Sequence, residues 1–404
     1  MAGNNLNQVG GPAIAPPGGN RQQAKVPFRR ATTGRTQTLQ RSAGTNVATP
    51  TNSFDVTIEG SGYMYGIDVQ HQVTCAANAA VVAYFEDAPW STFTSVVLRD
   101  VNGELINLPG FSLRVANVRG GWTGLDRSWQ NYTAPPVAAT NVLTTDVSIA
   151  QLSAAVGPGI GGSYNFHVQI PVGLNRRNLW GILGNQDRAQ KYSLRIDTAS
   201  AAAAAAGPIY TTAPTTQGTY VISRIYENYA VPGPVDANGH QQEQKPPQHG
   251  IVNFLTQSIN PSAPIASSTV NHYLPRLGNT IRFLSLIYRS GAVATGRVNA
   301  EALLPSQIQF NLGDTPIFVE TPAYRRQEMA KRYGVDAFQG EFTYDALTDF
   351  FGVQAGGELG DDWLWTSGLV NAQFAISYPA GVATASLTVI TGDSLVPTDV
   401  DVYA

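Results

Sequence analysis

The chain has 404 residues, of which 43% are apolar, enough to build the core of one large or two ordinary domains. It contains 40 glycines and 25 prolines but only 13% charged residues, about half the usual share, which suits a turn-rich protein whose surface is buried against neighbours. The only cysteine, Cys75, excludes an internal disulfide framework and any cysteine-ligated zinc or iron–sulfur site. The sequence has no apolar run of the roughly 18 residues that a membrane-spanning helix needs. Its start lacks the layout of a secretory signal, so we expect the chain to stay in the cell that makes it.

Residues 1–53 are predicted to form a basic N-terminal arm. Acidic residues are missing from this stretch, whereas residues 55–404 carry 19 basic and 28 acidic side chains. This asymmetry indicates a polyanionic partner for the arm, either nucleic acid or anionic lipid headgroups. Prolines and glycines oppose a long helix, so we expect an arm that is extended or only locally helical. A free tail that only aids solubility is the alternative. The basic residues of the arm are Arg21, Lys25, Arg29, Arg30, Arg35 and Arg41.

From Phe54 onward the chain reads as a series of short strands with alternating apolar and polar residues. Residues 232–250 have no such periodicity and four prolines, which marks a domain boundary. We therefore predict an all-β fold with one sandwich in residues 54–240 and another in residues 241–404, the latter including the C-terminal tail. Strands are predicted at 54–58, 67–75, 164–172, 192–196, 220–229, 281–288, 308–312, 342–344, 374–378 and 387–390.

Helices are expected to be few. The clearest runs from Pro322 to about Tyr333, with Thr321 as N-cap and Gly334 as the stop. Its basic residues are interrupted by acidic ones, which favours a solvated or intersubunit face over a nucleic-acid patch. Residues 89–104 and 275–291 share a plan of proline, polar turn and apolar strand, a weak sign of internal duplication.

The sequence contains none of the common motifs of phosphate-binding, zinc-peptidase or calcium sites. His240 and His249 are too poorly supplied with further ligands to predict a metal site. The run of residues 392–395, Gly-Asp-Ser-Leu, matches a short hydrolase signature, but the sequence has no histidine after His272 to serve as base. A strand-terminating turn explains the run better.

Two further patterns have plain explanations. Asp361 and Asp362 lie beside Trp363 and Trp365, as in a glycosidase or sugar-binding site, but adjacent residues of a strand face opposite ways. A subunit contact accounts for this segment better. Asn131 begins a glycosylation sequon, which we expect to be unused in a chain that is not secreted. We therefore expect neither an enzyme nor a bound cofactor or metal.

In its order of segments the whole chain resembles the major capsid proteins of tectiviruses, bacteriophages with a membrane inside an icosahedral shell. The likeness rests on collinearity and not on one diagnostic motif. The segments that carry it are the basic arm, residues 53–57, 69–75, 85–101, 164–172, 179–196, 222–229, 281–288 and the last strands through Leu387.

This resemblance implies a double jelly roll, with two eight-stranded rolls in one chain and three chains in a pseudo-hexagonal capsomer that tiles a shell. It also implies that the arm, with its six basic residues, lies on the inner face over the viral membrane. The partners would be copies of the same chain, vertex and minor capsid proteins and membrane lipids, in a virion assembled in the bacterial cytoplasm. Two alternatives remain open: a capsid protein whose arm binds packaged nucleic acid, and a sugar-binding or hydrolytic β-sandwich protein.

Overall fold

The structure is a computed structural model of the chain. It describes residues 32–39, 44–46, 52–59, 62–75, 83–84, 87, 90–119, 142–143, 147–150, 162–173, 181–185, 191–199, 210–212, 219–232, 254–260, 264–274, 276–290, 303–333, 340–345, 364–380 and 385–394.

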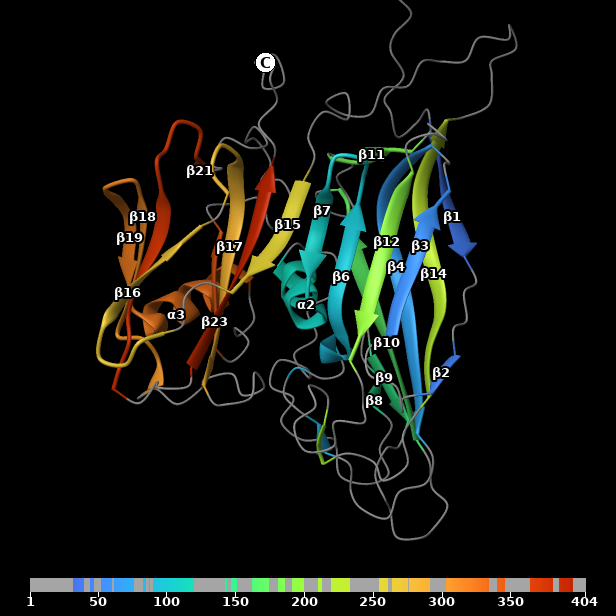
Figure 1. The fold of residues 1–404 in the computed structure, drawn as a ribbon, viewed down its shortest axis with the longest axis horizontal. Coiled ribbons are helices and arrows are strands. Elements are labelled where there is room, and N and C mark those ends of the chain that lie inside the picture. The colour runs from blue at the N-terminus through green and yellow to red at the C-terminus, as the bar shows by residue number, and fades with distance from the viewer. Residues whose placement is uncertain are drawn as a thin grey trace, which may run out of the picture.

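The first roll consists of two facing sheets (Figure 1). One sheet has the order β1-β14-β4-β10, formed by Thr32–Leu39, Thr219–Pro232, Tyr63–Cys75 and Gly162–Pro171. Its other members are β9 (Val147–Ala150), β8 (Val142–Leu143), β11 (Leu183–Gly184) and β2 (Gly44–Asn46). The facing strands have the order β3-β12-β6-β7, formed by Asn52–Ile58, Tyr192–Thr198, Phe93–Arg99 and Glu104–Leu108. A separate small pair joins β5 (Ala83–Tyr84) to β13 (Tyr210–Thr212).

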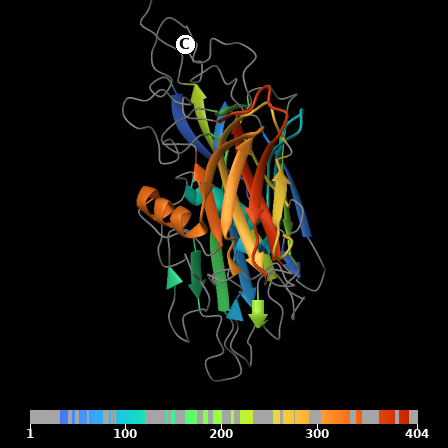
Figure 2. The ribbon, with the colours of Figure 1, turned by 90° about the vertical axis from the view of Figure 1, so that its left-hand side faces the viewer.

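The second roll repeats this plan. Its first half has the order β15-β23-β17-β20, formed by Phe254–Ile259, Ala385–Ser394, Thr280–Ser290 and Glu341–Asp345, with β21 (Leu364–Trp365) beside β17. The facing sheet has the order β16-β22-β18-β19, formed by Thr269–Tyr273, Ala372–Ser377, Gln307–Leu312 and Thr315–Glu320. Figure 2 views the molecule from the side of this sheet. In each roll the strands run through the same positions in the same chain order, so the fold is a double jelly roll with eight corresponding strands per roll.

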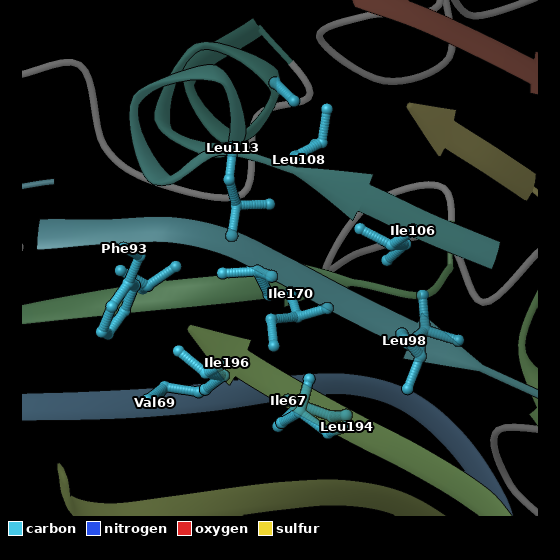
Figure 3. Packing of buried hydrophobic residues seen from close by; sticks show 14 of the residues in the cluster. Ile67, Val69, Phe93, Leu98, Ile106, Leu108, Leu113, Ile170, Leu194 and Ile196 are labelled. Carbon is cyan, nitrogen blue, oxygen red and sulfur yellow. The ribbon is translucent and has the colours of Figure 1, made fainter. Parts of the chain in front are cut away.

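The two rolls are fused into one block. The half β3-β12-β6-β7 of the first roll continues into the half β15-β23-β17-β20 of the second, which makes a single nine-stranded sheet once β21 is included. Each roll has its own apolar interior. In the first, Ile67 and Val69 of β4 and Ile170 of β10 face Leu98 of β6 and Leu194 of β12 (Figure 3). In the second, aromatic residues dominate, with Phe310 and Phe374 at 4.8 Å between ring centroids.

Two helices occupy equivalent places in the rolls. α2 (Gly110–Arg119) follows β7, and α3 (Pro322–Tyr333) follows β19. Asn117 of α2 donates a hydrogen bond to the Gln169 carbonyl of β10 (2.6 Å), and Met329 of α3 accepts one from the Thr343 amide of β20 (3.3 Å). Both helices therefore contact the edge of the corresponding strand of their roll. A short 3₁₀ turn, η1 (Trp90–Thr92), precedes β6.

The helix α3 has the bounds that the sequence predicts, and the Tyr324 amide donates to the Thr321 hydroxyl oxygen (3.3 Å), as expected of an N-cap. The sequence does not reveal α2, because residues 111–118 are buried on every side and carry no amphipathic pattern. The predicted equivalence of residues 89–104 with 275–291 is wrong. β6 corresponds to β18, and β17 corresponds to β4, so the repeat exists but pairs different segments.

Candidate assembly surfaces

The joint between the rolls is a parallel strand pair. Ile106 and Asn107 of β7 lie opposite Thr256 and Gln257 of β15. The Gln257 side-chain amide donates to the Glu104 carbonyl (3.1 Å), which adds a third link across the joint. The two rolls therefore meet through backbone edges, a contact that any free strand of the right direction could make.

Helix α2 lies at this joint, between the two rolls (Figure 1). Arg289 of β17 places its guanidinium 5.4 Å from the ring centre of Phe111, and it forms a buried ion pair with Asp87. A side chain added at Gly110 would meet the Trp90 carbonyl oxygen at 2.1 Å, so the helix start needs glycine to approach η1 this closely. The joint is thus filled by side chains from both rolls.

The corresponding edge of the second roll is uncovered among the described residues. β19 is the last strand of its sheet and exposes Ile317 and Val319, and Tyr324 is exposed at the start of α3. The outward positions of this four-stranded sheet carry no charge; they are Thr269, Asn271, Tyr273, Gln373, Ala375, Ser377, Gln307, Gln309, Asn311, Pro316, Ile317 and Val319. Antiparallel sheets that face water usually carry polar and charged residues, so this uncharged face is typical of a contact surface.

Two of the basic residues of α3, Arg325 and Lys331, form ion pairs with acidic residues. Arg325 is buried: its Nε donates to Glu320 (2.7 Å), and its guanidinium lies 4.3 Å from the ring centre of Tyr344. Lys331 lies 3.7 Å from Glu328. Arg325 and Lys331 are therefore paired with acidic residues of the same chain, and the buried Arg325 is not part of the solvated face that the sequence predicts.

Of the six predicted arm residues, the structure describes Arg35. It lies in β1, which pairs with β14 at the edge of the first roll, with Arg35 opposite Tyr229. The other five, Arg21, Lys25, Arg29, Arg30 and Arg41, lie outside the described residues. The sheet of the first roll thus begins at Thr32, inside the segment assigned to the arm.

One pocket of about 270 Å³ lies on the outer face of the first roll, lined by Tyr65, Asp68, Gln169 and Asn228 among others. The Gln169 and Asn228 amides donate to Asp68 (2.6 and 3.2 Å), and the Thr36 hydroxyl donates to Asn228 (3.2 Å). These bonds form a polar ladder across four strands. They already engage the carboxylate, so the ladder holds the sheet together and is not an open catalytic site.

The hydrolase-like run is part of a buried strand. Ser394 is buried in β23 between Phe254 and Thr280 of the neighbouring strands. A side chain at Gly392 would collide with the Phe283 ring at 2.1 Å, which explains the glycine by packing. Burial raises the pKa of the Asp393 carboxyl, and Arg276, 3.6 Å away, opposes that shift. The predicted strand-terminating turn is wrong for residues 392–394, which lie within β23, and Leu395 lies outside the described residues.

Two of the three described histidines, His71 and His272, lie in the cores, and His167 of β10 is exposed. Burial lowers the pKa of His71 to about 3, and its ring lies 5.0 Å from Phe93. Burial also lowers the pKa of His272 to about 4, and its Nε2 lies 2.8 Å from the Tyr378 hydroxyl. Both histidines are neutral near pH 7, which suits structural roles. His240, His249, Asp361, Asp362 and Asn131 lie outside the described residues.

Within the described ranges, no group of three or more histidine, cysteine or acidic residues is arranged to hold a metal ion. The same ranges contain no helix long and apolar enough to span a membrane.

Comparison with known proteins connects this fold to viral shells. No protein-family model and no curated protein matches the sequence. Among solved structures, the major capsid protein of Sulfolobus turreted icosahedral virus matches with a TM-score of 0.57 and 15% identity, over 90% of this chain and 97% of that one. The PBCV-1 virus capsid matches with a TM-score of 0.58 and 12% identity, over 92% and 95%. The Faustovirus major capsid protein matches with a TM-score of 0.52 and 9% identity, over 90% of each chain. The chain therefore has the fold of double jelly-roll capsid proteins.

Proposed function

We propose that this chain is a major capsid protein that forms trimeric, pseudo-hexagonal capsomers in the icosahedral shell of a bacteriophage with an internal membrane. The observation that supports this most directly is that the chain contains two equivalent jelly rolls joined edge to edge. Three such chains supply six similar sides, and a six-sided block can fill a near-hexagonal net with quasi-equivalent contacts. Vertex and minor capsid proteins would complete the shell. The role is structural, without a catalytic site or cofactor.

The N-terminal arm is proposed to face the viral membrane. Residues 1–31 carry Arg21, Lys25, Arg29 and Arg30 and no acidic residue, and each could add up to about 1 kcal/mol of attraction to an anionic leaflet. Arg35 and Arg41 continue the basic stretch. Phe28 is the lone aromatic residue of the arm, and six basic residues are few for an arm that binds packaged nucleic acid. Assembly in the cytoplasm of the bacterial host completes the proposal.

Sedimentation of the full chain and vesicle binding test these statements together. The purified protein should sediment as a trimer at micromolar concentration, and a stable monomer would contradict the capsomer. Deleting residues 2–31 leaves β1 intact, so the trimer should persist while binding to vesicles of one-third phosphatidylglycerol in phosphatidylcholine is lost. A matched variant with glutamine at Arg21, Lys25, Arg29 and Arg30 should lose binding equally. Vesicle binding that stays unchanged in the deletion and glutamine variants would overturn the membrane role. So would variants that lose binding to DNA but keep binding to vesicles.

A further inference from the structure

We propose that β19 of one copy pairs in parallel with β1 of a second copy, repeating between chains the joint that β7 and β15 make within the chain. This inference rests on the proposed capsid function and names the surface through which the subunits of a capsomer associate.

The first argument is the equivalence of the four strands. β7 and β19 each form a hairpin with the preceding strand, end their half of the roll and lead within two residues into a helix. β15 and β1 each occupy the outer position beside the last strand of their roll, β23 and β14. The joint inside the chain uses β7 and β15. Among the described strands, β19 of the second roll is the equivalent of β7, and β1 of the first roll is the equivalent of β15; both remain at sheet edges.

The hairpins fix which residues of β19 take the place of those in β7. Ile106 lies opposite Leu98, and Phe318 lies opposite Phe310. In both rolls this residue faces the core and precedes the first helical residue by four positions. Phe318 is therefore the counterpart of Ile106, and Val319 is the counterpart of Asn107.

A β-bulge fixes the correspondence of the other edge. The register shifts at Met64 and Gly66 where β4 meets β14, and at Ile281 and Phe283 where β17 meets β23. Aligning these bulges matches Asn228 of β14 with Gly392 of β23.

This match also fixes the alignment of the strands next to β14 and β23, which are β1 and β15. Asn228 lies opposite Thr36, and Gly392 lies opposite Thr256. Thr36 and Gln37 therefore stand where Thr256 and Gln257 stand in the second roll, with the same two residue types. Thr256 and Gln257 are the residues that meet β7. We thus expect Phe318 opposite Thr36 and Val319 opposite Gln37 of the next copy.

The second argument is burial. Leu105 of β7 is 5% exposed and belongs to a core cluster that includes residues of the second roll, whereas its counterpart Ile317 is 44% exposed and Val319 is 52% exposed. The helices differ in the same way: Ser112 of α2 is 3% exposed and its counterpart Tyr324 of α3 is 51% exposed. The strand and the helix face that are buried in the internal joint are thus the ones left open at the outer edge.

The chemistry of the edge selects a protein partner. β19 exposes apolar side chains and a free backbone edge, and the outward face of its sheet has no cationic side chain for phosphate groups. An exposed edge strand binds another strand by continuing the sheet. A second copy supplies β1 with the threonine and glutamine of the internal joint already at the required positions. A head-to-tail contact closes a ring when its rotations add up to a full turn, and three copies do so in the proposed capsomer.

Disulfide trapping tests the pairing and its register. In a Cys75→Ser background, the Gln37→Cys, Val319→Cys double variant should form covalent dimers and trimers on mild oxidation, since opposed residues of adjacent strands bring their Cβ atoms to about 5 Å. Each single variant should form no such ladder. A register control, Gln37→Cys with Thr315→Cys, places the thiols four residues apart along the strand and should cross-link at least tenfold more slowly.

Charge substitution gives a second readout. Ile317→Asp with Val319→Asp should abolish the trimer peak in sedimentation while near-native circular dichroism is kept, because both side chains are exposed in the single chain. The matched control Ile265→Asp, at an exposed apolar residue just before β16, the strand at the opposite edge of this sheet, should remain trimeric. Two results would overturn the strand pairing: trimers that persist in the Ile317→Asp, Val319→Asp variant, or a register control that cross-links as fast as the Gln37→Cys, Val319→Cys variant. Neither result would contradict the proposed trimeric capsomer. A monomeric wild type would instead overturn the proposed function.

Discussion

His71 and His272 each lie in the core of one roll, and both remain uncharged in the folded chain near neutral pH. The unfolded chain binds a proton at each histidine below about pH 6.5. The folded chain does so only near pH 4 at His272 and near pH 3 at His71. Stability from these two residues is therefore complete above pH 7 and declines as the pH falls, by up to about 1.4 kcal/mol per histidine and pH unit.

Replacing one of these histidines should flatten this dependence. We expect His71→Gln to lose less stability between pH 7 and pH 5 than the wild type, measured as the shift of the urea midpoint. His167→Gln is the matched control, because His167 is exposed on the same sheet. If His71→Gln and the wild type lose the same stability over this range, His71 does not titrate as its burial requires.

At the scale of elements, the sequence reveals most strands with a buried face, including β3 and β20 at the two ends of their sheet, and misses several others at sheet edges or at the joint. Alternation predicts β4, β10, β12, β14, β17, β18, β20, β22 and β23, whose apolar residues fill the two interiors. It does not predict β1, β15, β16 or β19, because these strands lie at edges or at the joint, where pairing is made by backbone and alternation is weak. The candidate assembly edge was missed for this reason.

The sequence contains a signal for the edge formed by β1, but that signal can be interpreted only once the fold is known. Thr36-Gln37-Thr38 and Thr256-Gln257-Ser258 are near-identical tripeptides, but such short polar repeats are common and carry no periodicity. Their meaning comes from their registers with β14 and β23, which only pairing reveals. The basic arm, in contrast, is visible in composition alone, because six cationic residues stand without acidic ones.

The helix α3 offers a test at this scale, since its start was predicted to the residue. Thr321→Ala removes the hydroxyl that accepts the Tyr324 amide bond and should lower the free energy of unfolding by about 1 kcal/mol. Thr321→Ser keeps the hydroxyl acceptor, so its free energy of unfolding should remain within a few tenths of a kcal/mol of the wild-type value. Urea unfolding followed by circular dichroism measures both, and equal stability of the alanine variant would show that α3 does not depend on this cap.

For the molecule as a whole, the continuous sheet makes the two rolls one mechanical unit. The core cluster of the first roll includes Phe283, Ile287 and Ile390 of the second, and the buried ion pair of Asp87 with Arg289 crosses the joint. We expect a single unfolding transition, with coincident midpoints from tryptophan fluorescence and from circular dichroism.

Breaking the ion pair should test this coupling. Arg289→Ala leaves the Asp87 carboxylate buried without its cation and should cost about 3–5 kcal/mol. Asp87→Asn together with Arg289→Met should recover much of that loss. Arg99→Ala, which removes an exposed ion pair with Glu104, should cost under about 1 kcal/mol. Two separate transitions in the wild type would contradict a single cooperative block.

The parallel sense of the β7–β15 joint has a geometrical consequence. β1, β7 and β15 run in the same direction (Figure 1), so a roll added through such a joint is rotated but never turned upside down. A ring grown in this way is polar: every strand end of one kind emerges on the same surface. The two surfaces of such a ring therefore differ through the direction of the backbone alone, without any contribution from a lipid, a genome or another component.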